Sequence, residues 1–250
     1  MTPEIMSGCE PFSSAGGRLG VLVLHGFTGN PASMRSIAQR IAGAGYAVEL
    51  PRLPGHGTSV EDMMTTSWTD WSTAALDAFD TLSAKCEKVA VVGLSMGGSL
   101  TAYVAASRPA VVGCVFINPL VKSPGPEMEE GIGQALEAGI ETVDSIGSNI
   151  KKEGTKEVSY DATPLRCVLS LFEGVRGVEA RLSNITAPSL LLSSRVDSVV
   201  PTDNGDTLVA LSSGPIERIW LEDSYHVATM DNDQELVESA TLDFLAKVLV

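Results

Sequence analysis

Residues 89–106 form a short apolar run that passes through Gly93-Leu-Ser-Met-Gly97 into an alanine-rich stretch. A serine at the centre of a Gly-x-Ser-x-Gly pattern, between a strand and a helix, sits on a sharp turn that lifts its hydroxyl out of the sheet. Gly93 and Gly97 suit this turn because a side chain at either position would collide with the neighbouring strand or helix. We therefore expect Ser95 to be a nucleophile. The Met96 N–H, at the start of the helix, would face a developing oxyanion.

The base that activates such a serine is usually a histidine held in one tautomer by a carboxylate. The chain has three histidines. His25 and His56 precede Ser95 and stand next to glycines, whereas His226 follows the last apolar run. Because the chain order that accompanies this turn is nucleophile, acid, histidine, we expect His226 to be the base. His25 and His56 are interpreted as structural histidines.

The acid of the triad must lie between Ser95 and His226, at the end of a strand, because the triad assembles at that edge of the sheet. Asp197 closely follows the apolar run Ser189–Leu192 and precedes Ser-Val-Val-Pro201, a pattern typical of a strand that leads into a helix. We expect Asp197 to be the acid. The other candidates are Asp203 and Asp206, which suit the first turn of the next helix, and Asp223, which suits the loop that carries His226.

An oxyanion hole needs a second backbone donor, from the loop after the first central strand. The loop 25–29, His-Gly-Phe-Thr-Gly, follows the apolar run 21–24. We expect the N–H of Phe27 to pair with that of Met96, while the two glycines of the loop let the backbone approach the substrate.

Six continuous apolar runs are expected to be strands that helices cover on both faces. They are Leu19–Leu24, Ala47–Leu50, Val89–Val92, Val111–Ile117, Ser189–Leu192 and Arg218–Leu221. Helical patterns cover residues 31–44, 67–85, 96–107, 203–212 and 233–249. This alternation predicts an α/β fold with a mostly parallel central sheet and helices on both faces. Ligands of such sheets bind outside the carboxyl ends of the strands, where residues 93–97 fall.

The segment 119–165 interrupts the alternation. It has no clear strand, six glycines and an acidic run at Glu127–Glu130. Long structureless insertions are uncommon in compact domains unless they are functional. We expect a small helical cap (lid) over the active site, inserted in a single domain of residues 1–250. The alternative is a surface excursion without a role.

The composition limits the kinds of substrate and partner that we expect the protein to bind. With 17 Lys and Arg against 31 Asp and Glu, the net charge of −14 disfavours nucleic acid and anionic membranes, so the expected substrate is neutral or apolar. The first residues lack the pattern of a secretory signal, and no apolar run is long enough for an integral membrane segment.

The four cysteines have no metal-like or redox spacing, so the cytoplasm is the expected compartment. No metal or nucleotide site is indicated, and no cofactor is expected.

Four stretches of the chain resemble the α/β-hydrolase superfamily and, within it, the bacterial monoacylglycerol lipases and related small carboxylesterases. They are the loop 25–29, the turn Pro51-Arg-Leu-Pro-Gly-His-Gly-Thr58, Gly93-Leu-Ser-Met-Gly-Gly98 and Asp223-Ser-Tyr-His-Val-Ala-Thr-Met-Asp231. Residues 1–18 are too short for the antiparallel hairpin that opens larger members of the superfamily, which leaves the number of strands open.

This resemblance implies a serine hydrolase that cleaves a fatty acid from a monoacylglycerol, a small lipid ester. Its triad would be Ser95, Asp197 and His226, and Phe27 and Met96 would donate to the oxyanion. The resemblance also implies that Asp144–Ser148 lines an acyl channel with Ile146 touching the substrate, and that Glu157 meets the glycerol hydroxyls. For Glu157 the alternative is a solvated charge.

Two alternative functions stay open. A general carboxylesterase for short or medium-chain esters would use the same triad, and a non-catalytic ligand-binding protein would keep only the fold. Exposed apolar surface of the cap is expected to serve either a homodimer or contact with lipid.

Overall fold

A seven-stranded sheet forms the centre of the computed structural model, which describes residues 3–145 and 148–250. Its strands lie in the order β1-β3-β2-β4-β5-β8-β9, and only β1 and β3 are antiparallel neighbours among those described. The strands are β1 Phe12–Ser14, β2 Leu19–Leu24, β3 Ala47–Leu50, β4 Lys88–Leu94, β5 Val111–Ile117, β8 Ser189–Ser194 and β9 Ile216–Leu221. Because parallel neighbours need crossover connections, helices separate the parallel strands β2, β3, β4, β5, β8 and β9 along the chain.

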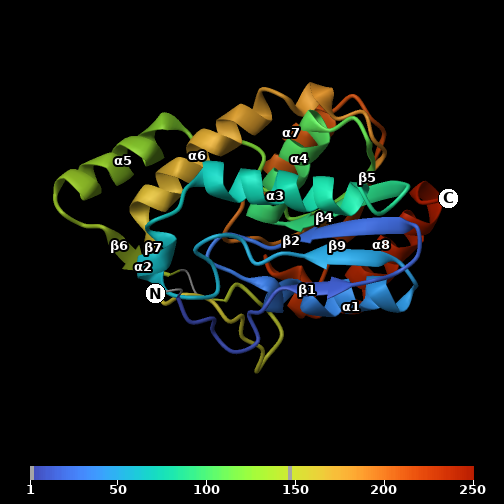
Figure 1. The fold of residues 1–250 in the computed structure, drawn as a ribbon. Helices are drawn as coiled ribbons and strands as arrows, with labels where there is room; N and C mark the ends of the chain where they lie inside the picture. Colours follow the sequence, from blue (N-terminus) through green and yellow to red (C-terminus); the bar gives the residue numbers. More distant parts are fainter. Residues whose placement is uncertain (1–2, 146–147) are drawn as a thin grey trace.

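Helices cover both faces of the sheet (Figure 1). One face carries α1 Arg35–Gly43 and α8 Gln234–Val248. The opposite face carries α3 Trp68–Ser83, α4 Met96–Ser107, α6 Leu165–Glu179 and α7 Asp203–Leu211. The shorter helical turns are η1 Pro31–Met34, α2 Val60–Met63, η2 Leu182–Asn184 and η3 Ala228–Met230.

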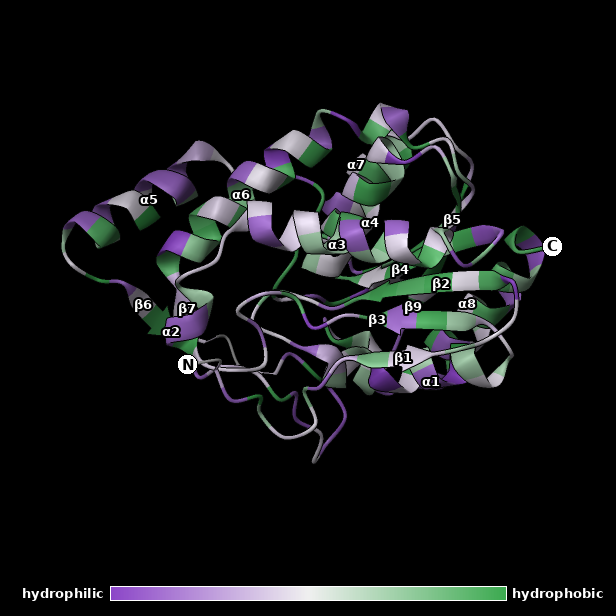
Figure 2. Ribbon diagram, viewed as in Figure 1, coloured by the Kyte–Doolittle hydropathy of each residue, from purple (hydrophilic) through white to green (hydrophobic). Residues whose placement is uncertain are grey.

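The alternation of side chains along the strands divides the core into two layers. Val21 and Val23 of β2 pack in the layer with α1 and α8, whereas Leu22 and Leu24 pack in the layer with α3 and α4. The side chains of both layers are buried, so the central strands are apolar on both faces, and β2 is coloured as hydrophobic over most of its length (Figure 2). This explains why the strands appear in the sequence as continuous apolar runs.

The expected fold class is confirmed, and the six strands and five helices predicted from the sequence are present with ends shifted by a few residues. Residues 31–44 divide into the 3₁₀ turn η1 and the helix α1. Strand β1 was not expected. It is a single three-residue strand at the edge of the sheet, too short to produce a pattern in the sequence.

The segment 119–165, called the cap segment below, contains more regular structure than its sequence indicated. It forms α5 Pro126–Glu137 and two short strands, β6 Thr142–Asp144 and β7 Ala162–Pro164, which pair with each other in a separate antiparallel ribbon. The expectation of no strand here was wrong, because three-residue strands that pair only locally leave no apolar run. Helix α5 has no buried residue and lies beside α6, away from the sheet (Figure 1).

Helix α6 was missed because Gly174 and Gly177 interrupt its helical pattern. Close packing between helices explains why residue 174 is a glycine. A Cβ on Gly174 would lie 2.0 Å from Cδ2 of Trp68, so α6 approaches the start of α3 more closely than any side chain would permit. Among the described residues, no helix is long and apolar enough to cross a bilayer.

Candidate active site

Ser95 occupies the turn between β4 and α4 in a strained backbone conformation, with φ 57° and ψ −119°. Its N–H donates to the Ile117 carbonyl at the end of β5 (3.0 Å), and its own carbonyl accepts the N–H of Gly98 (2.8 Å). Such a conformation costs about 1–3 kcal/mol and persists only where the surrounding structure enforces it. Ser95 is partly exposed, whereas its immediate neighbours are buried. The turn therefore presents the hydroxyl at the surface of a rigid frame.

Gly93 and Gly97 allow this turn to form. A Cβ on Gly93 would lie 2.0 Å from the carbonyl oxygen of Gly97, and a Cβ on Gly97 would lie 2.1 Å from the carbonyl oxygen of Leu24. The first turn of α4 thus packs directly on the backbones of β4 and β2. The expected collision of a side chain at either glycine is confirmed.

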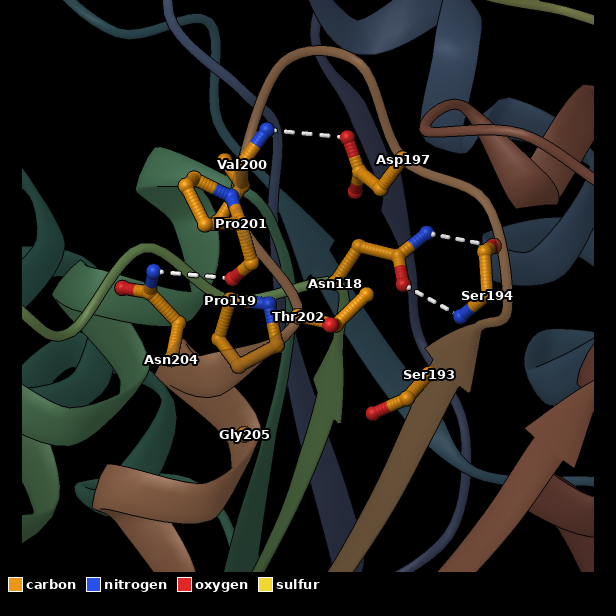
Figure 3. A pocket seen from close by; sticks show the side chains of 10 residues that line it. All are labelled: Asn118, Pro119, Ser193, Ser194, Asp197, Val200, Pro201, Thr202, Asn204 and Gly205. Carbon is orange, nitrogen blue, oxygen red and sulfur yellow. Dashed lines mark hydrogen bonds between the residues drawn. The ribbon is translucent and has the colours of Figure 1, made fainter.

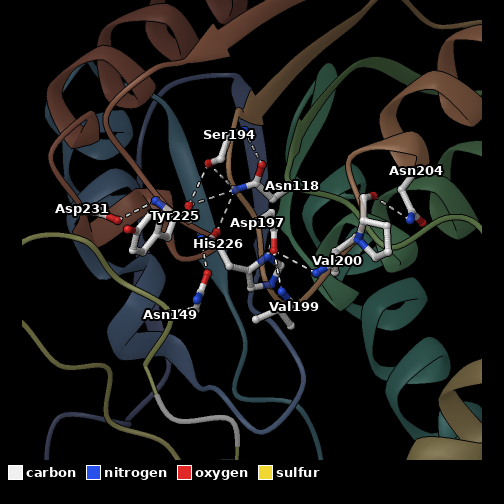
Figure 4. Close-up of polar contacts among 11 residues, drawn as sticks. Asn118, Asn149, Ser194, Asp197, Val199, Val200, Asn204, Tyr225, His226 and Asp231 are labelled. Atoms are coloured by element: carbon white, nitrogen blue, oxygen red, sulfur yellow. Dashed lines mark hydrogen bonds and ion pairs between the residues drawn. The ribbon is translucent and has the colours of Figure 1, made fainter.

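Asp197 and His226 form a buried pair at the carboxyl ends of β8 and β9. Nδ1–H of His226 donates to Oδ2 of Asp197 over 2.7 Å, and the two side chains are 7% and 2% exposed. The other carboxylate oxygen accepts the N–H groups of Val199 and Val200, each at 2.8 Å (Figure 4). Since Nδ1 carries the proton, Nε2 of a neutral imidazole keeps its lone pair and can act as a base.

The order of strands in the sheet explains how residues that are distant in the sequence come to lie at one edge. Ser95 follows β4, Asn118 follows β5, Asp197 follows β8 and His226 follows β9, and these four strands are consecutive and parallel in the sheet. Their carboxyl ends therefore share one edge. Asp203 pairs with Lys122 in an exposed ion pair, as suits the first turn of α7 rather than the triad.

Asn118, which the sequence did not single out, joins the end of β5 to the end of β8 and to the loop 222–227. This loop carries His226 and is called the histidine loop below. Its Nδ2 donates to the carbonyl of His226 (2.8 Å) and to Oγ of Ser194 (2.9 Å), and its Oδ1 accepts the N–H of Ser194 (2.8 Å) (Figures 3 and 4). The residue is buried with φ 42°, a conformation that asparagine tolerates better than most residues. Its position directly after an apolar strand was the available signal.

A small cavity beside Asp197 is lined by residues that include Asn118, Ser193 and Asn204 (Figure 3). Its volume of about 10 Å³ is enough for about one water molecule. An ester therefore does not reach Asp197 through this cavity.

The loop 25–29 lies against the serine. A Cβ on Gly26 would lie 3.4 Å from Cβ and 3.9 Å from Oγ of Ser95. Within the described part of the chain, neither the N–H of Phe27 nor that of Met96 donates a hydrogen bond to another protein group. Met96 is the first residue of α4, where helical N–H groups lack an acceptor. Two unpaired donors thus stand in the segments beside Ser95. Their role in an oxyanion hole stays a prediction.

His25 and His56 are buried side by side, with ring centroids 5.2 Å apart. Nδ1–H of His25 donates to the Gly26 carbonyl (3.0 Å) and Nε2 accepts the N–H of Leu53 (3.1 Å), so the ring must be neutral. Nδ1–H of His56 donates to the Pro54 carbonyl (2.9 Å). Desolvation lowers the pKa of His25 to about 3 and the pKa of His56 to about 4. These bonds suit histidines that hold loops in place.

Glu157 of the cap segment reaches the same edge. One of its carboxylate oxygens lies 2.9 Å from where a Cβ on Gly29 would stand. Burial raises the pKa of Glu157, and nearby His226 and a hydrogen bond with Ser33 oppose the rise. Ile146, the other residue that the resemblance implied for the substrate, lies outside the described residues.

A mostly parallel sheet, a strained serine turn after a central strand and an acid–histidine pair at the same edge define an α/β-hydrolase. The family model described as serine aminopeptidase, S33 (Hydrolase_4) matches residues 18–233, and the chain belongs to this family.

Known proteins with similar sequences span nearly the whole chain. The chain is 42% identical to the thermostable monoacylglycerol lipase of Bacillus sp. (strain H-257), over 97% of this chain and 96% of that protein. It is 26% identical to the carboxylesterase of Bacillus subtilis (strain 168), over 96% and 97%. A solved structure reported for the metagenome-derived lipolytic enzymes LipS and LipT matches with a TM-score of 0.93 and 39% identity, over 98% and 100% of the two chains. The resemblance to bacterial monoacylglycerol lipases and small carboxylesterases is confirmed.

Acid should destabilise the protein through His25 and His56. In the unfolded chain each takes up a proton near its ordinary pKa of about 6.5. The folded chain resists protonation until the pH falls to about 4 for His56 and about 3 for His25. Above pH 6.5 the two histidines therefore do not reduce the free energy of unfolding. As the pH drops below that value this free energy falls, by about 2 kcal/mol for each histidine between pH 7 and pH 5. Urea unfolding at the two pH values measures this loss.

His56→Asn is the matched variant, because the asparagine amide can still donate to the Pro54 carbonyl but does not titrate. We expect its loss of stability between pH 7 and pH 5 to be about 2 kcal/mol smaller than that of the wild type. The same loss in both proteins would show that His56 is not the acid-sensitive group.

Proposed function

We propose that the protein hydrolyses the ester bond of monoacylglycerols to a fatty acid and glycerol, through an acyl-enzyme on Ser95. The observation that carries this proposal is the buried hydrogen bond from His226 to Asp197, at the sheet edge where the strained turn presents Ser95. The 42% identity to a monoacylglycerol lipase over nearly the whole chain supports the choice of substrate.

The first step of the proposed mechanism is acylation of the serine. Oγ of Ser95 attacks the ester carbonyl while Nε2 of His226 takes its proton. The imidazolium that forms is stabilised by the carboxylate of Asp197, which the N–H groups of Val199 and Val200 hold in place. The carbonyl oxygen becomes an oxyanion that accepts hydrogen bonds from the N–H groups of Phe27 and Met96.

Collapse of the tetrahedral intermediate breaks the bond to glycerol, and His226 donates its proton to the departing oxygen. Water then attacks the acyl-enzyme while His226 removes a proton from that water. The second tetrahedral intermediate breaks its bond to Oγ of Ser95 and releases the fatty acid, and His226 returns the proton to Oγ. Each proton that the imidazole accepts is returned within the same half of the cycle, so no cofactor is required.

The cap segment is proposed to cover this site and to supply its selectivity. Glu157 lies beside Gly29 of the loop 25–29 and interacts electrostatically with His226. Its carboxyl oxygens are proposed to accept hydrogen bonds from the glycerol hydroxyls. Ile146 is proposed to touch the acyl chain. A flexible aliphatic chain gains affinity chiefly from buried area, which an aliphatic cap provides.

The carboxylesterase of Bacillus subtilis, 26% identical over nearly the whole chain, supports the second candidate function, a general carboxylesterase for short or medium-chain esters. The two candidates share Ser95, Asp197 and His226 and differ in the alcohol and acyl groups that the cap segment accepts. A non-catalytic binding protein would have no need of the Asp197–His226 pair, which is kept in full.

We further propose a cytoplasmic setting and a homodimer formed through the cap segment. The cysteines Cys9, Cys86, Cys114 and Cys167 are all free, as is usual in a reducing compartment. Met128 and Ile140 are 56% and 47% exposed on the cap segment, and a second copy of the chain would cover such apolar side chains.

Replacing Ser95 should remove hydrolysis. We expect Ser95→Ala to lower kcat by about 10⁶-fold, because a serine triad acts as a unit. The measurement uses monoacylglycerols with acyl chains of 2 to 18 carbons, alongside p-nitrophenyl esters of the same acids. For the wild type we expect kcat/KM to rise with acyl length and to favour the glycerol esters. A preference for short p-nitrophenyl esters would favour the carboxylesterase, and near-normal turnover by Ser95→Ala would contradict the proposed nucleophile.

Replacing Glu157 should affect only substrates with a glycerol group. With Glu157→Gln we expect kcat/KM for a monoacylglycerol to fall about 10-fold, the equivalent of one charge-assisted hydrogen bond. The p-nitrophenyl ester of the same acid should change less than about twofold by the same reasoning. Glu153→Gln, on an exposed carboxyl of the cap segment, is the control and should leave both rates unchanged. An equal fall on both substrates would indicate that Glu157 acts through His226 rather than on glycerol.

A further inference from the structure

Residues 149–152 of the cap segment are joined to the loop that carries His226. The N–H of His226 donates to Oδ1 of Asn149 (2.9 Å; Figure 4). The N–H of Val227 donates to the carbonyl of Asn149 (3.1 Å). One residue of the cap segment thus accepts two consecutive N–H groups at the position of the histidine.

Asp231, which ends the motif Asp223–Asp231, also connects residues 149–152 to the histidine loop. We call this connection the joint below. Its Oδ2 accepts the N–H of Lys151 (2.7 Å) and the N–H of Tyr225 (2.8 Å), and its Oδ1 accepts the N–H of Lys152 (2.8 Å). The residue is 1% exposed. A buried carboxylate that receives backbone N–H groups from both segments holds them in one register, because each of its bonds is charge-assisted.

The opposite side of the histidine is anchored to the sheet. Asn118 donates to the carbonyl of His226 (2.8 Å), while Asn149 accepts its N–H. Both peptide groups of the histidine are therefore fixed. Asn149 of the cap segment accepts the N–H of each, and Asn118 in the core also donates to the carbonyl of the second. The torsions left to the side chain are set by its bond to Asp197.

We propose that Asp231 is a positioning residue that fastens residues 149–152 to the histidine loop, so that this part of the cap segment and the imidazole of His226 form one mechanical unit. This inference rests on the proposed function, in which His226 is the base. Asp231 touches neither Asp197 nor the reacting atoms, and acts through the backbone of residues 225–227. A motion of the cap segment that lifted residues 149–152 would also withdraw the base, so the path for the substrate must open elsewhere in the cap segment.

Amide hydrogen exchange followed by NMR on the full chain tests the joint without reference to activity. In the wild type we expect the amides of Lys151, Lys152, His226 and Val227 to be protected and to open together. Asp231→Asn replaces one acceptor oxygen with an amide that faces N–H donors, and should accelerate exchange at all four by about 10-fold or more. Acceleration confined to residues 151 and 152, with residues 226 and 227 unchanged, would overturn the proposal.

Glu238→Gln is the matched control. Glu238 is another buried carboxylate, on α8, where it accepts a hydrogen bond from Oγ of Ser36 (2.6 Å) and contacts α1 rather than the histidine loop. This variant loses a comparable buried charge, so a general loss of stability should appear in it as well. We expect its exchange at residues 151, 152, 226 and 227 to match that of the wild type.

The functional readout separates kcat from KM on p-nitrophenyl acetate, an ester too small to need an acyl channel. Asp231→Asn and Asn149→Ala should lower kcat about 10-fold and leave KM within about twofold, since they displace the base and not the substrate. Glu238→Gln should keep the wild-type kcat although its melting temperature falls. If Asp231→Asn does not fold, Asn149→Ala carries the test, because Asn149 is only partly buried.

The outcomes distinguish this inference from the proposed function. A wild type that hydrolyses no ester would overturn the proposed function and this inference with it. An active wild type whose kcat is matched by Asp231→Asn and Asn149→Ala would overturn this inference alone.

Discussion

The backbone turn at Ser95 is the constraint on which the rest of the site depends. The conformation at φ 57° is strained for a side chain, and it persists because α4 begins in direct contact with the backbones of β4 and β2 at Gly93 and Gly97. The same geometry exposes the hydroxyl and leaves the N–H of Met96 without a helical partner. The proposed nucleophile and the proposed oxyanion donor are therefore both positioned by the packing of α4 on the sheet.

The parallel sheet completes the site by bringing the ends of four strands to one edge. Ser95, Asn118, Asp197 and His226 each follow one of the consecutive strands β4, β5, β8 and β9. The loops would otherwise be free to move, and buried asparagine and carboxylate groups hold them by accepting or donating backbone hydrogen bonds. The cap segment joins this frame through Asn149, and Glu157 of the same segment lies beside Gly29 of the loop 25–29. The groups proposed to supply selectivity and catalysis thus share one set of supports.

The sequence predicts much of the fold because strands buried on both faces appear as continuous apolar runs. The glycine pattern predicts the turn at Ser95. Chain order singles out His226, and the place directly after an apolar strand singles out Asp197, which the structure brings into contact with His226. Asn118 has a comparable signal, its position directly after an apolar strand, but its role and that of Asp231 could not be predicted. Those roles depend on which strands are neighbours and on how the cap segment folds back. Helix α6 was missed because the glycine that permits its close packing on Trp68 also weakens its pattern.

The central claim is that the Asp197–His226 pair makes one serine hydroxyl reactive. The most direct measurement is covalent labelling of the folded protein with a fluorophosphonate, followed by mass spectrometry of its peptides, because only an activated serine reacts at an appreciable rate. We predict about one adduct per chain, located on Ser95, and a labelling rate at least about 100-fold lower in His226→Ala. An adduct on another serine, or an unlabelled protein that still hydrolyses esters, would contradict the claim.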